Sequence, residues 1–362
     1  MEVVMSTTAA VSKSIAESVM PATNQRVVIS RFGGPEVLEI VENEIPQPGP
    51  GTVRVRIIAA GLSGADLLMR EGVHPRTPRT PFTSGWDLVG FVDEVGPGAT
   101  GLEHGAMVVA MPIWGSHARY ICLKRDELVP VPPGLDPLAA LCLVFNYMTA
   151  YQMMHRCAHV RSGQRVLIHG GSGGIGTALL ELGRVAGLEM YATASQDGLE
   201  IVRSLGGTAI DYRNADFVEE VRRLPNGGVD VVFDGVGGRH IWESRKALRR
   251  GGKVVVYGFT GRLHGGKFAG IRYPLRGFGA IGLMMAGTFV LPGRKRVWPF
   301  SVDRLKQFKP LWFREDLATL FGLLARKEIV PIIAERIPLQ EIRRAHLLLG
   351  QGGVRGRIVL IC

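Results

Sequence analysis

The sequence predicts an α/β protein in which a doubly wound parallel sheet follows a compact, largely β unit. Short alternating strands broken by glycine and proline run from Val27 to about Met148, which is typical of such a β unit. Apolar strands alternate with helical segments from Thr149 to about Val302, which is typical of a parallel sheet. The glycine-rich stretch "HGGSGGIG" joins the first of these strands to a helix. At 362 residues the chain is long enough for two domains.

The first β unit is predicted over residues 26–148. Its strands are carried by "TVRVRIIAAGLS", "GFVDEVGPG" and "AMVVAMPIW". Residues 1–25 are rich in Ser, Thr and Ala and have no apolar core of signal-peptide length, so we expect a flexible extension outside the fold.

The parallel-sheet domain is predicted over residues 149–322. After "GTAIDY" come a helix around "ADFVEEVRRL", the strand "VDVVFDGVGG", a helix around "WESRKALRR" and the strand "GKVVVYGFTG". The remaining residues, 323–362, contain a helix in "LQEIRRAHLLLG" and a strand in "GRIVLIC" that we expect to return to the β unit. A ligand at the carboxyl edge of the parallel sheet then faces a cleft between the domains.

Five of the seven residues from Gly170 to Gly176 are glycine, between the buried strand at Val166–Ile168 and a helix. In such a unit Gly170 lets the chain turn, Gly173 lets a pyrophosphate approach the backbone and Gly176 lets helix and strand pack closely. A tight structural turn is the alternative. The position between strand and helix favours dinucleotide binding, with contacts from Gly170, Ser172, Gly173, Gly174, Ile175 and Gly176.

Composition excludes several other classes. The four cysteines are scattered, which argues against a zinc knot or a disulfide framework and favours free thiols in the cytoplasm. The net charge of +11 includes basic clusters at 245–253 and 294–296, but no nucleic-acid module accompanies them, so we expect no nucleic-acid partner. The apolar stretch 278–291 is too short to span a bilayer; it is either a buried or domain-interface segment or a membrane-surface contact.

The order of these parts resembles the medium-chain dehydrogenase/reductase superfamily, within it the zinc-free quinone oxidoreductases related to zeta-crystallin. The motifs that carry the resemblance are "RFGGPEVLEI", "AAGLSGADLLMREGVHP", "TSGWDLVGFVDEVGPG", "VLIHGGSGGIG" and "GRIVL". "NYMTAY" with "GTAIDY" is similar to the branch of the synaptic vesicle amine transport protein homologue. The resemblance implies a GroES-like β domain, a Rossmann domain and a homodimer. Glu181 stands where the family usually has Gln, and we expect little effect on cofactor binding.

Zinc-dependent members of the superfamily hold a catalytic zinc with cysteine and histidine. The matching positions here carry Ser63 and Trp86, and no four-cysteine lobe follows. Neither side chain replaces a thiolate or an imidazole, so we predict an enzyme without a metal.

The second strand of the parallel sheet ends in Thr193, Ala194 and Ser195 rather than in the acidic residue that binds the ribose hydroxyls of NAD. By resemblance, a 2′-phosphate would be bound by Ser195, Tyr212 and Arg213, whereas relatives often add a lysine where this chain has Gly198. The alternative is that these are ordinary strand-end residues. We predict NADPH over NADH as the cofactor.

The chemistry is expected at the nicotinamide end. Val236, Tyr257 and Gly258 meet the nicotinamide by family analogy. Relatives often place an asparagine and tyrosines at the positions of Ser63, Leu68 and His74. One candidate proton donor is therefore His74, which could instead be a surface loop residue. A second candidate set is Asn146, Tyr147 and Thr149 in "NYMTAY", which could instead serve the packing of a helix start.

Two functions of different kind follow. The first is an enzyme, an NADPH-dependent, zinc-independent reductase of a quinone or an activated carbon–carbon double bond (enone), with a small-molecule substrate. The second is a weakly catalytic nucleotide-binding protein associated with membranes or partners, possible through 278–291. Turnover of NADPH with quinones and enones separates the two.

Overall fold

The computed structural model describes residues 23–259, 263–264, 267–268 and 295–362. Residues 1–22 of the predicted extension and the apolar stretch 278–291 lie outside the described residues. The first strand begins at Asn24, so the last residues of the predicted extension belong to the fold. Within the described residues, no helix is long and apolar enough to cross a membrane.

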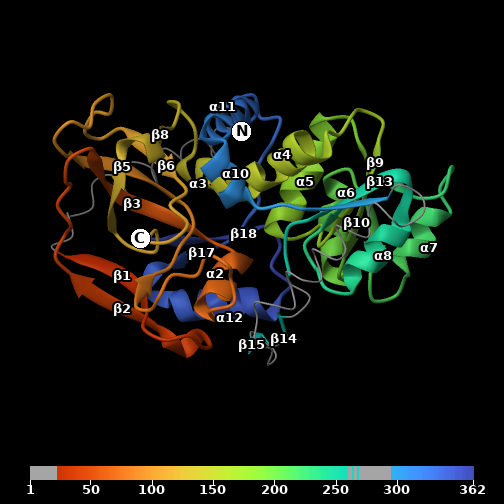
Figure 1. The fold of residues 1–362 in the computed structure, drawn as a ribbon, viewed down its shortest axis with the longest axis horizontal. Coiled ribbons are helices and arrows are strands. Elements are labelled where there is room, and N and C mark those ends of the chain that lie inside the picture. Colours follow the sequence, from red (N-terminus) through yellow and green to blue (C-terminus); the bar gives the residue numbers. More distant parts are fainter. Residues whose placement is uncertain (1–22, 260–262, 265–266, 269–294) are drawn as a thin grey trace, which may run out of the picture.

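The second part of the chain forms a parallel sheet, which lies at the right of Figure 1. Within the described residues its strand order is β11-β10-β9-β12-β13-β16. These strands are β9 (Arg165–His169), β10 (Glu189–Ala194), β11 (Thr208–Asp211), β12 (Val229–Asp234), β13 (Leu248–Val256) and β16 (Arg296–Pro299). The order reverses between β9 and β12, which is the switch point where doubly wound sheets bind their ligands. The predicted fold class is confirmed.

Helices connect these parallel strands. They are α5 (Gly174–Val185), α6 (Leu199–Ser204), α7 (Phe217–Arg222) and α8 (His240–Ala247), with the 3₁₀ turn η5 (Gln196–Gly198) before α6. The N-cap of α7 is Asp216, whose carboxylate accepts the Val218 N–H at 2.8 Å. The helix predicted around "WESRKALRR" is present as α8, which ends at Ala247, and β13 already begins at Leu248. Leu248 is buried in the apolar face of the sheet, and this packing overrides helical propensity.

The first β unit, at the left of Figure 1, is antiparallel. Its small sheet has the order β2-β1-β4, and its large sheet joins β3, β5, β6 and β8, with β7 paired to β3. The strands are β1 (Asn24–Ile29), β2 (Leu38–Asn43), β3 (Thr52–Leu62), β4 (Phe82–Thr83), β5 (Leu88–Val95), β6 (Met107–Ala110), β7 (Tyr120–Lys124) and β8 (Val129–Pro130). The 3₁₀ turns η1 (Pro35–Val37) and η2 (Arg125–Glu127) and the helix α2 (Gly64–Arg70) connect them.

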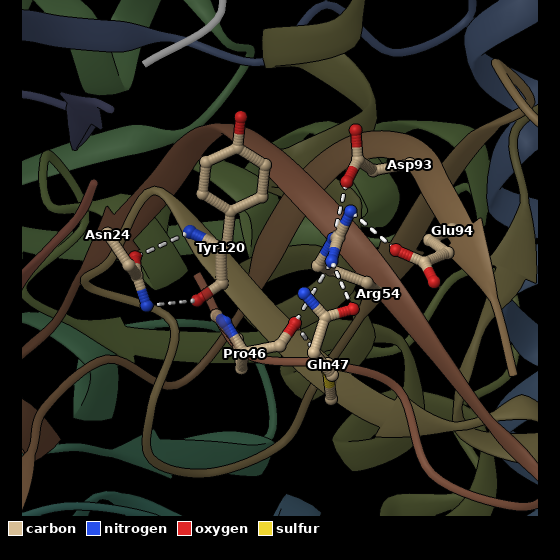
Figure 2. Close-up of polar contacts among 8 residues, drawn as sticks. Asn24, Pro46, Gln47, Arg54, Asp93, Glu94 and Tyr120 are labelled. Atoms are coloured by element: carbon tan, nitrogen blue, oxygen red, sulfur yellow. Dashed lines mark hydrogen bonds and ion pairs between the residues drawn. The ribbon is translucent and has the colours of Figure 1, made fainter. Parts of the chain in front are cut away.

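Hydrogen bonds and ion pairs of polar side chains connect the strands of this unit (Figure 2). Arg54 on β3 binds the carboxylates of Asp93 and Glu94 on β5, and its guanidinium also reaches the Pro46 carbonyl and the Gln47 side chain. The Asn24 side chain pairs with the backbone of Tyr120, donating to its carbonyl at 3.1 Å and accepting its N–H at 2.9 Å. The contacts of Arg54 tie β3 to β5, and those of Asn24 tie β1 to β7.

The C-terminal strands return to the sheet of the first unit. β17 (Ile333–Pro338) pairs with β18 (Arg357–Ile361), and β18 runs antiparallel to β3. The helix α12 (Ile342–Gln351), preceded by the 3₁₀ turn η7 (Leu339–Glu341), connects the two strands. The proposed domain limits at residues 148 and 322 stay predictions. Two short strands, β14 (Leu263–His264) and β15 (Lys267–Phe268), form a separate pair.

A helical run lies between the two sheets (Figure 1). It comprises α3 (Pro137–Cys142), η3 (Leu143–Tyr147), α4 (Met148–Gln152) and η4 (Met153–Ala158), and it packs beside α10 (Val302–Phe308) and α11 (Pro310–Ala325). Asp136 caps α3 by accepting the Ala139 N–H at 2.8 Å. Both η3 and η4 are π-helical, a local irregularity that is frequent at functional sites.

One buried ion pair anchors β18. The Arg357 guanidinium lies 2.5 and 2.7 Å from the two carboxylate oxygens of Asp87, and both side chains are fully buried. It crosses directly over Gly61 on β3, where any Cβ atom would overlap it. Gly61 is therefore required at that position for steric reasons.

Candidate active site

The glycine turn between β9 and α5 has the geometry of a phosphate cradle. Gly170 adopts a left-handed φ of +71° and turns the chain. A Cβ atom on Gly173 would find only the Gly170 carbonyl oxygen within 4 Å, at 3.5 Å, so the space beside this backbone is open. The unpaired amides and the dipole at the start of α5 favour an anion here. The residues present therefore fit a dinucleotide pyrophosphate.

The other glycines of the turn are required by close packing. A Cβ on Gly176 would overlap the Gly170 carbonyl oxygen, which explains how α5 approaches β9. A Cβ on Gly174 would overlap the Nδ2 atom of Asn146. Asn146 lies in the π-helical η3, which brings its amide against the phosphate turn.

A cavity of about 1030 Å³ extends from this turn to the first β unit. Its wall includes the glycine turn, the ends of β12 and β13, the helical run around Asn146, and residues of α2 and the loop after it. Residues 356–358 at the start of β18 complete the wall. Both predicted domains therefore contribute to one site, as the sequence predicted for a cleft at the carboxyl edge of the sheet.

At the nicotinamide end, Asp234 holds the loop after β12. One carboxylate oxygen accepts the N–H groups of Val236 and Gly237, each at 2.9 Å. The Tyr257 N–H, just after β13, donates to the Asp234 carbonyl at 3.0 Å. Burial raises the pKa of Tyr257, so its hydroxyl stays protonated. Val236 and Tyr257 are thus fixed beside each other in the cavity wall.

A buried polar network lies behind this loop. The Ser244 hydroxyl donates to the second oxygen of Asp234 at 2.6 Å and lies 3.1 Å from His169 Nε2, while His240 Nδ1 lies 3.2 Å from the same carboxylate oxygen. The ligand atoms of His169, Asp234 and His240 lie within 4.8 Å of one another, a spacing that would also suit a metal ion. Because Ser244 already binds Asp234 and His169, we interpret the group as a hydrogen-bonded support for the loop.

The pKa values agree with this interpretation. Burial lowers the pKa of His169 to about 3, so it is neutral. Burial by itself raises the pKa of Asp234, but the hydrogen bonds from His240, Gly237 and Ser244 help to hold the pKa below its ordinary value. An ionised Asp234 is the stronger acceptor for the two loop amides.

The predicted adenosine-end residues lie beyond the ends of β10 and β11 and outside the cavity wall. Tyr212 is half exposed, its N–H reaches the Ala194 carbonyl at 3.4 Å, and the Arg213 guanidinium lies 5.9 Å from its ring centre. A Cβ on Gly198 would lie 2.5 Å from the Ser172 hydroxyl. The lysine that relatives carry at this position would therefore displace Ser172.

A cation that the sequence analysis missed approaches this end. Arg355 lies 3.8 Å from Asp197, and both side chains are exposed. Arg355 is placed there because the adjacent Gly356 N–H donates to the Ser172 carbonyl at 2.9 Å, which ties the C-terminal segment to the glycine turn. Only the glycines around Arg355 in the sequence hinted at a close backbone approach.

His74 lines the cavity but differs from the histidine expected from sequence. Burial lowers its pKa to about 4, the charge of Asp303 raises it in part, and Arg76 lowers it further. It is therefore neutral at pH 7 and does not titrate near neutral pH. Its Nδ1 accepts the Arg76 N–H at 3.2 Å, so the ring proton is on Nε2. His74 is a hydrogen-bond donor in this state, not an imidazolium acid.

The two positions that match zinc ligands have other roles. The Ser63 hydroxyl donates to the Asp66 carboxylate at 2.8 Å in the cap of α2. Trp86 is buried between His74 and Phe145, with ring centres 5.1 and 5.4 Å away. The absence of a catalytic metal stays a prediction that rests on the identity of these residues.

The predicted site residues divide into two groups. Those that line the cavity are His74, Asn146, Thr149, Gly170, Gly173, Gly174, Ile175, Gly176, Val236, Tyr257 and Gly258. Those that do not line it are Tyr147, Ser172, Ser195, Tyr212 and Arg213. The Tyr147 hydroxyl donates to Glu181, which also accepts the Val330 N–H, so both side chains serve packing of α5 rather than the cavity.

Other wall residues were not assigned to the site from the sequence, although Lys253 and Arg296 belong to the basic clusters 245–253 and 294–296. Lys253, Arg296 and Trp298 lie in the wall along β13 and β16, and Ser301 and Asp303 border it at the start of α10. They come from different elements that the fold brings together. Local pattern could not place them in the site.

Two sequence families match the chain. The family described as "Alcohol dehydrogenase GroES-like domain" matches residues 49–133, and the family described as "Zinc-binding dehydrogenase" matches residues 205–360. The first covers most of the β unit and the second covers the later parallel strands and the C-terminal return.

Known proteins resemble nearly the whole chain. "Synaptic vesicle membrane protein VAT-1 homolog-like" of Mus musculus is 29% identical over 92% of this chain and 80% of its own length. "Quinone oxidoreductase" of Pongo abelii is 26% identical over 94% of this chain and 99% of its own length. A mycobacterial protein solved in complex with NADPH is 25% identical and superimposes with a TM-score of 0.80, covering 94% of this chain and 100% of the other.

Two glycine variants separate cofactor binding from folding. In Gly173→Leu the added side chain enters open space, so the fold is retained and NADPH binding, measured by fluorescence titration, is abolished. In Gly176→Ala the added methyl overlaps the Gly170 carbonyl, so the free energy of unfolding falls by about 1–3 kcal/mol. NADPH affinity equal to that of the unaltered protein in Gly173→Leu would exclude the cradle.

Proposed function

Because the chain belongs to the medium-chain dehydrogenase/reductase superfamily, in its quinone oxidoreductase and VAT-1 branch, we propose that it is an NADPH-dependent, zinc-independent reductase of quinones or activated carbon–carbon double bonds. The observation that carries the proposal is the cavity shared by the glycine turn, the strand ends at Val236 and Tyr257, and the first β unit. A cavity with this lining supports a dinucleotide and a small substrate bound against each other.

The bound nicotinamide would supply the hydride. The chain would hold the dinucleotide with the glycine turn, fix the loop at Val236 through Asp234, and exclude water with the ring of Trp86 and its aromatic neighbours. Negative charge that develops on the substrate oxygen needs a donor. His74 Nε2–H is the candidate from the first unit, and Asn146 and Thr149 are the candidates from the helical run.

Thr149 has a feature that supports its candidacy. Its side chain is buried, it lines the cavity, and within the described part of the chain its hydroxyl has no hydrogen-bond partner. An unpaired buried hydroxyl costs free energy that a bound oxygen could recover. No side chain of this set is an ionisable acid at pH 7, so solvent is proposed as the final source of the proton.

The choice of NADPH is supported by the charges beyond β10 and β11. Arg213 follows the end of β11, and Arg355 lies 3.8 Å from Asp197, an exposed residue three positions after the end of β10. Asp211, the last residue of β11, already accepts the Arg213 N–H and the Asn214 side-chain amide. The mycobacterial relative was solved with NADPH. We propose that Ser195, Tyr212, Arg213 and Arg355 receive the 2′-phosphate.

A panel of quinones and enones tests the proposal. Loss of NADPH absorbance with at least one electron-poor substrate, faster than with NADH, is the expected result. The absence of turnover across the panel, with NADPH bound, would favour the weakly catalytic alternative. The panel should include saturated ketones as a control, because reduction of a plain carbonyl is not expected without a Lewis acid.

Arg355 provides a test of cofactor choice. Arg355→Ser should raise the KM for NADPH roughly tenfold and leave the KM for NADH nearly unchanged, because the lost contact is a charged hydrogen bond to the 2′-phosphate. Arg250→Ser, which removes an exposed arginine outside the cavity wall, is the matched control. An equal rise with both cofactors in Arg355→Ser would count against the assignment.

His74 gives a prediction about pH. Since the pKa of His74 lies at about 4, its neutral donor form is present throughout pH 5–8. The pH profile of kcat/KM should therefore have no step near pH 6.5 that depends on His74, and the profiles of the unaltered protein and of His74→Gln should have the same shape there. His74→Ala should lower kcat by no more than about 10²-fold, the lower limit for a positioned donor. An imidazolium acid would instead make activity fall as the pH rises through 6.5.

A further inference from the structure

Two cations lie side by side in the wall of the cavity. Lys253 on β13 and Arg296 on β16 are register partners in the parallel sheet, and both line the cavity. Register partners project from the same face of a sheet, and like charges directly opposite each other destabilise the pairing. Arg296 itself is exposed on the edge strand β16, whereas Lys253 is partly buried.

Within the described residues neither cation is neutralised by a carboxylate. The Lys253 ammonium donates to the Ala158 carbonyl at 2.7 Å. Burial lowers the pKa of Lys253, the neighbouring Cys157 thiol raises it in part, and the charge of Arg296 lowers it further. By contrast, Arg156 in the same wall binds Asp316 at 2.8 Å.

The acidic side chain in the described part of the wall is paired with another cation. Among the described residues that line the cavity, the one carboxylate is Asp303, and it lies 3.5 Å from the Arg76 guanidinium. The positive charge of Lys253 and Arg296 is thus open to an anion that enters the cavity.

An apolar path leads from the cations to the nicotinamide end. Side chains alternate along a strand, so Trp298 shares the face of Arg296, and Phe300 follows in the same wall. On the neighbouring strand, Tyr257 lies four residues after Lys253, which corresponds to about 13 Å at the rise of a parallel strand. Along this strand pair the wall therefore offers apolar rings between the cations and the strand end.

We propose that Lys253 and Arg296 bind an anionic group of the substrate, a carboxylate or a phosphate, which an apolar chain joins to the reducible double bond about 13 Å away. The inference rests on the proposed function, because that function places the double bond at the strand end. It narrows the substrate from any electron-poor double bond to an amphipathic enone with an acidic end. Trp298 covers the apolar chain between the two ends.

The test uses straight-chain enones of graded length that differ only at the far end, which is a methyl group, a carboxylate or a phosphate monoester. With NADPH in excess, the KM of an anionic enone of matching length should be roughly tenfold below that of the methyl enone, as expected for a charge-assisted hydrogen bond. The difference should shrink as ionic strength rises. The larger effect among the two anions identifies which group is bound.

Variants of Arg296 connect this preference to the site. Arg296→Gln should reduce the ratio of the KM of the methyl enone to the KM of the anionic enone severalfold. Arg296→Glu should abolish the preference for the anionic enone. Because its carboxylate pairs favourably with Lys253, the thermal midpoint of this variant should stay at or above that of the unaltered protein. Arg250→Gln, with the same charge change on an exposed residue of β13, is the control. An equal change of the ratio in Arg250→Gln and Arg296→Gln would overturn the site in favour of general electrostatic attraction.

The outcomes separate this inference from the proposed function. Reduction of the methyl enone without any preference for the anionic enones would overturn the inference and leave the function intact. If no enone is reduced, calorimetric titration of the saturated carboxylate into the NADPH-loaded protein still tests the cations. Binding that Arg296→Glu removes would support them, whereas binding that it leaves unchanged, or no binding to either protein, would exclude them.

Discussion

Two adjacent residues, Gly356 and Arg357, join the parallel sheet to the first β unit. The Gly356 N–H binds the Ser172 carbonyl in the glycine turn, and the Arg357 guanidinium binds Asp87 across the backbone of Gly61. A buried ion pair is strongly destabilising when one partner is lost, since the other charge remains buried and unpaired. The distance between the phosphate turn and the wall of the first unit therefore depends on these two neighbouring residues at the start of β18, one of which binds the turn and the other Asp87.

The rest of the site consists of close contacts around the glycine turn and the loop after β12. Gly173 leaves open space for a phosphate, and Gly174 lies against Asn146. Asp234 fixes the loop at Val236, with Ser244 and His240 behind it. A rigid frame of this kind suits hydride transfer, in which position and exclusion of water contribute most of what the protein adds.

The sequence was sufficient for features that depend on local pattern. The strand, glycine turn and helix around Gly170–Gly176 were predicted because periodicity and glycine spacing encode them. The choice of Val236 and Tyr257 came instead from the family resemblance. Residues that act through distant partners were not predicted: Arg355, Lys253 and Arg296 reach the site only through strand pairing and the C-terminal return. The state of His74 was also missed, because its pKa depends on burial that no local pattern reveals.

The replacement of zinc-ligand types by Ser63 and Trp86 has a chemical consequence for specificity. A Lewis acid activates a plain carbonyl, whereas neutral donors such as His74 and Thr149 stabilise an oxygen anion more weakly. In the proposed reaction the substrate itself must then be electron-poor, as quinones and conjugated double bonds are. Many metabolites meet that electronic requirement, so the reacting centre alone discriminates little. In our proposal, substrate selection depends on the remote part of the cavity, where Lys253 and Arg296 offer charge and Trp298 offers an apolar surface. Binding energy from such a remote group can position the double bond against the nicotinamide, which would raise the rate as well as the affinity.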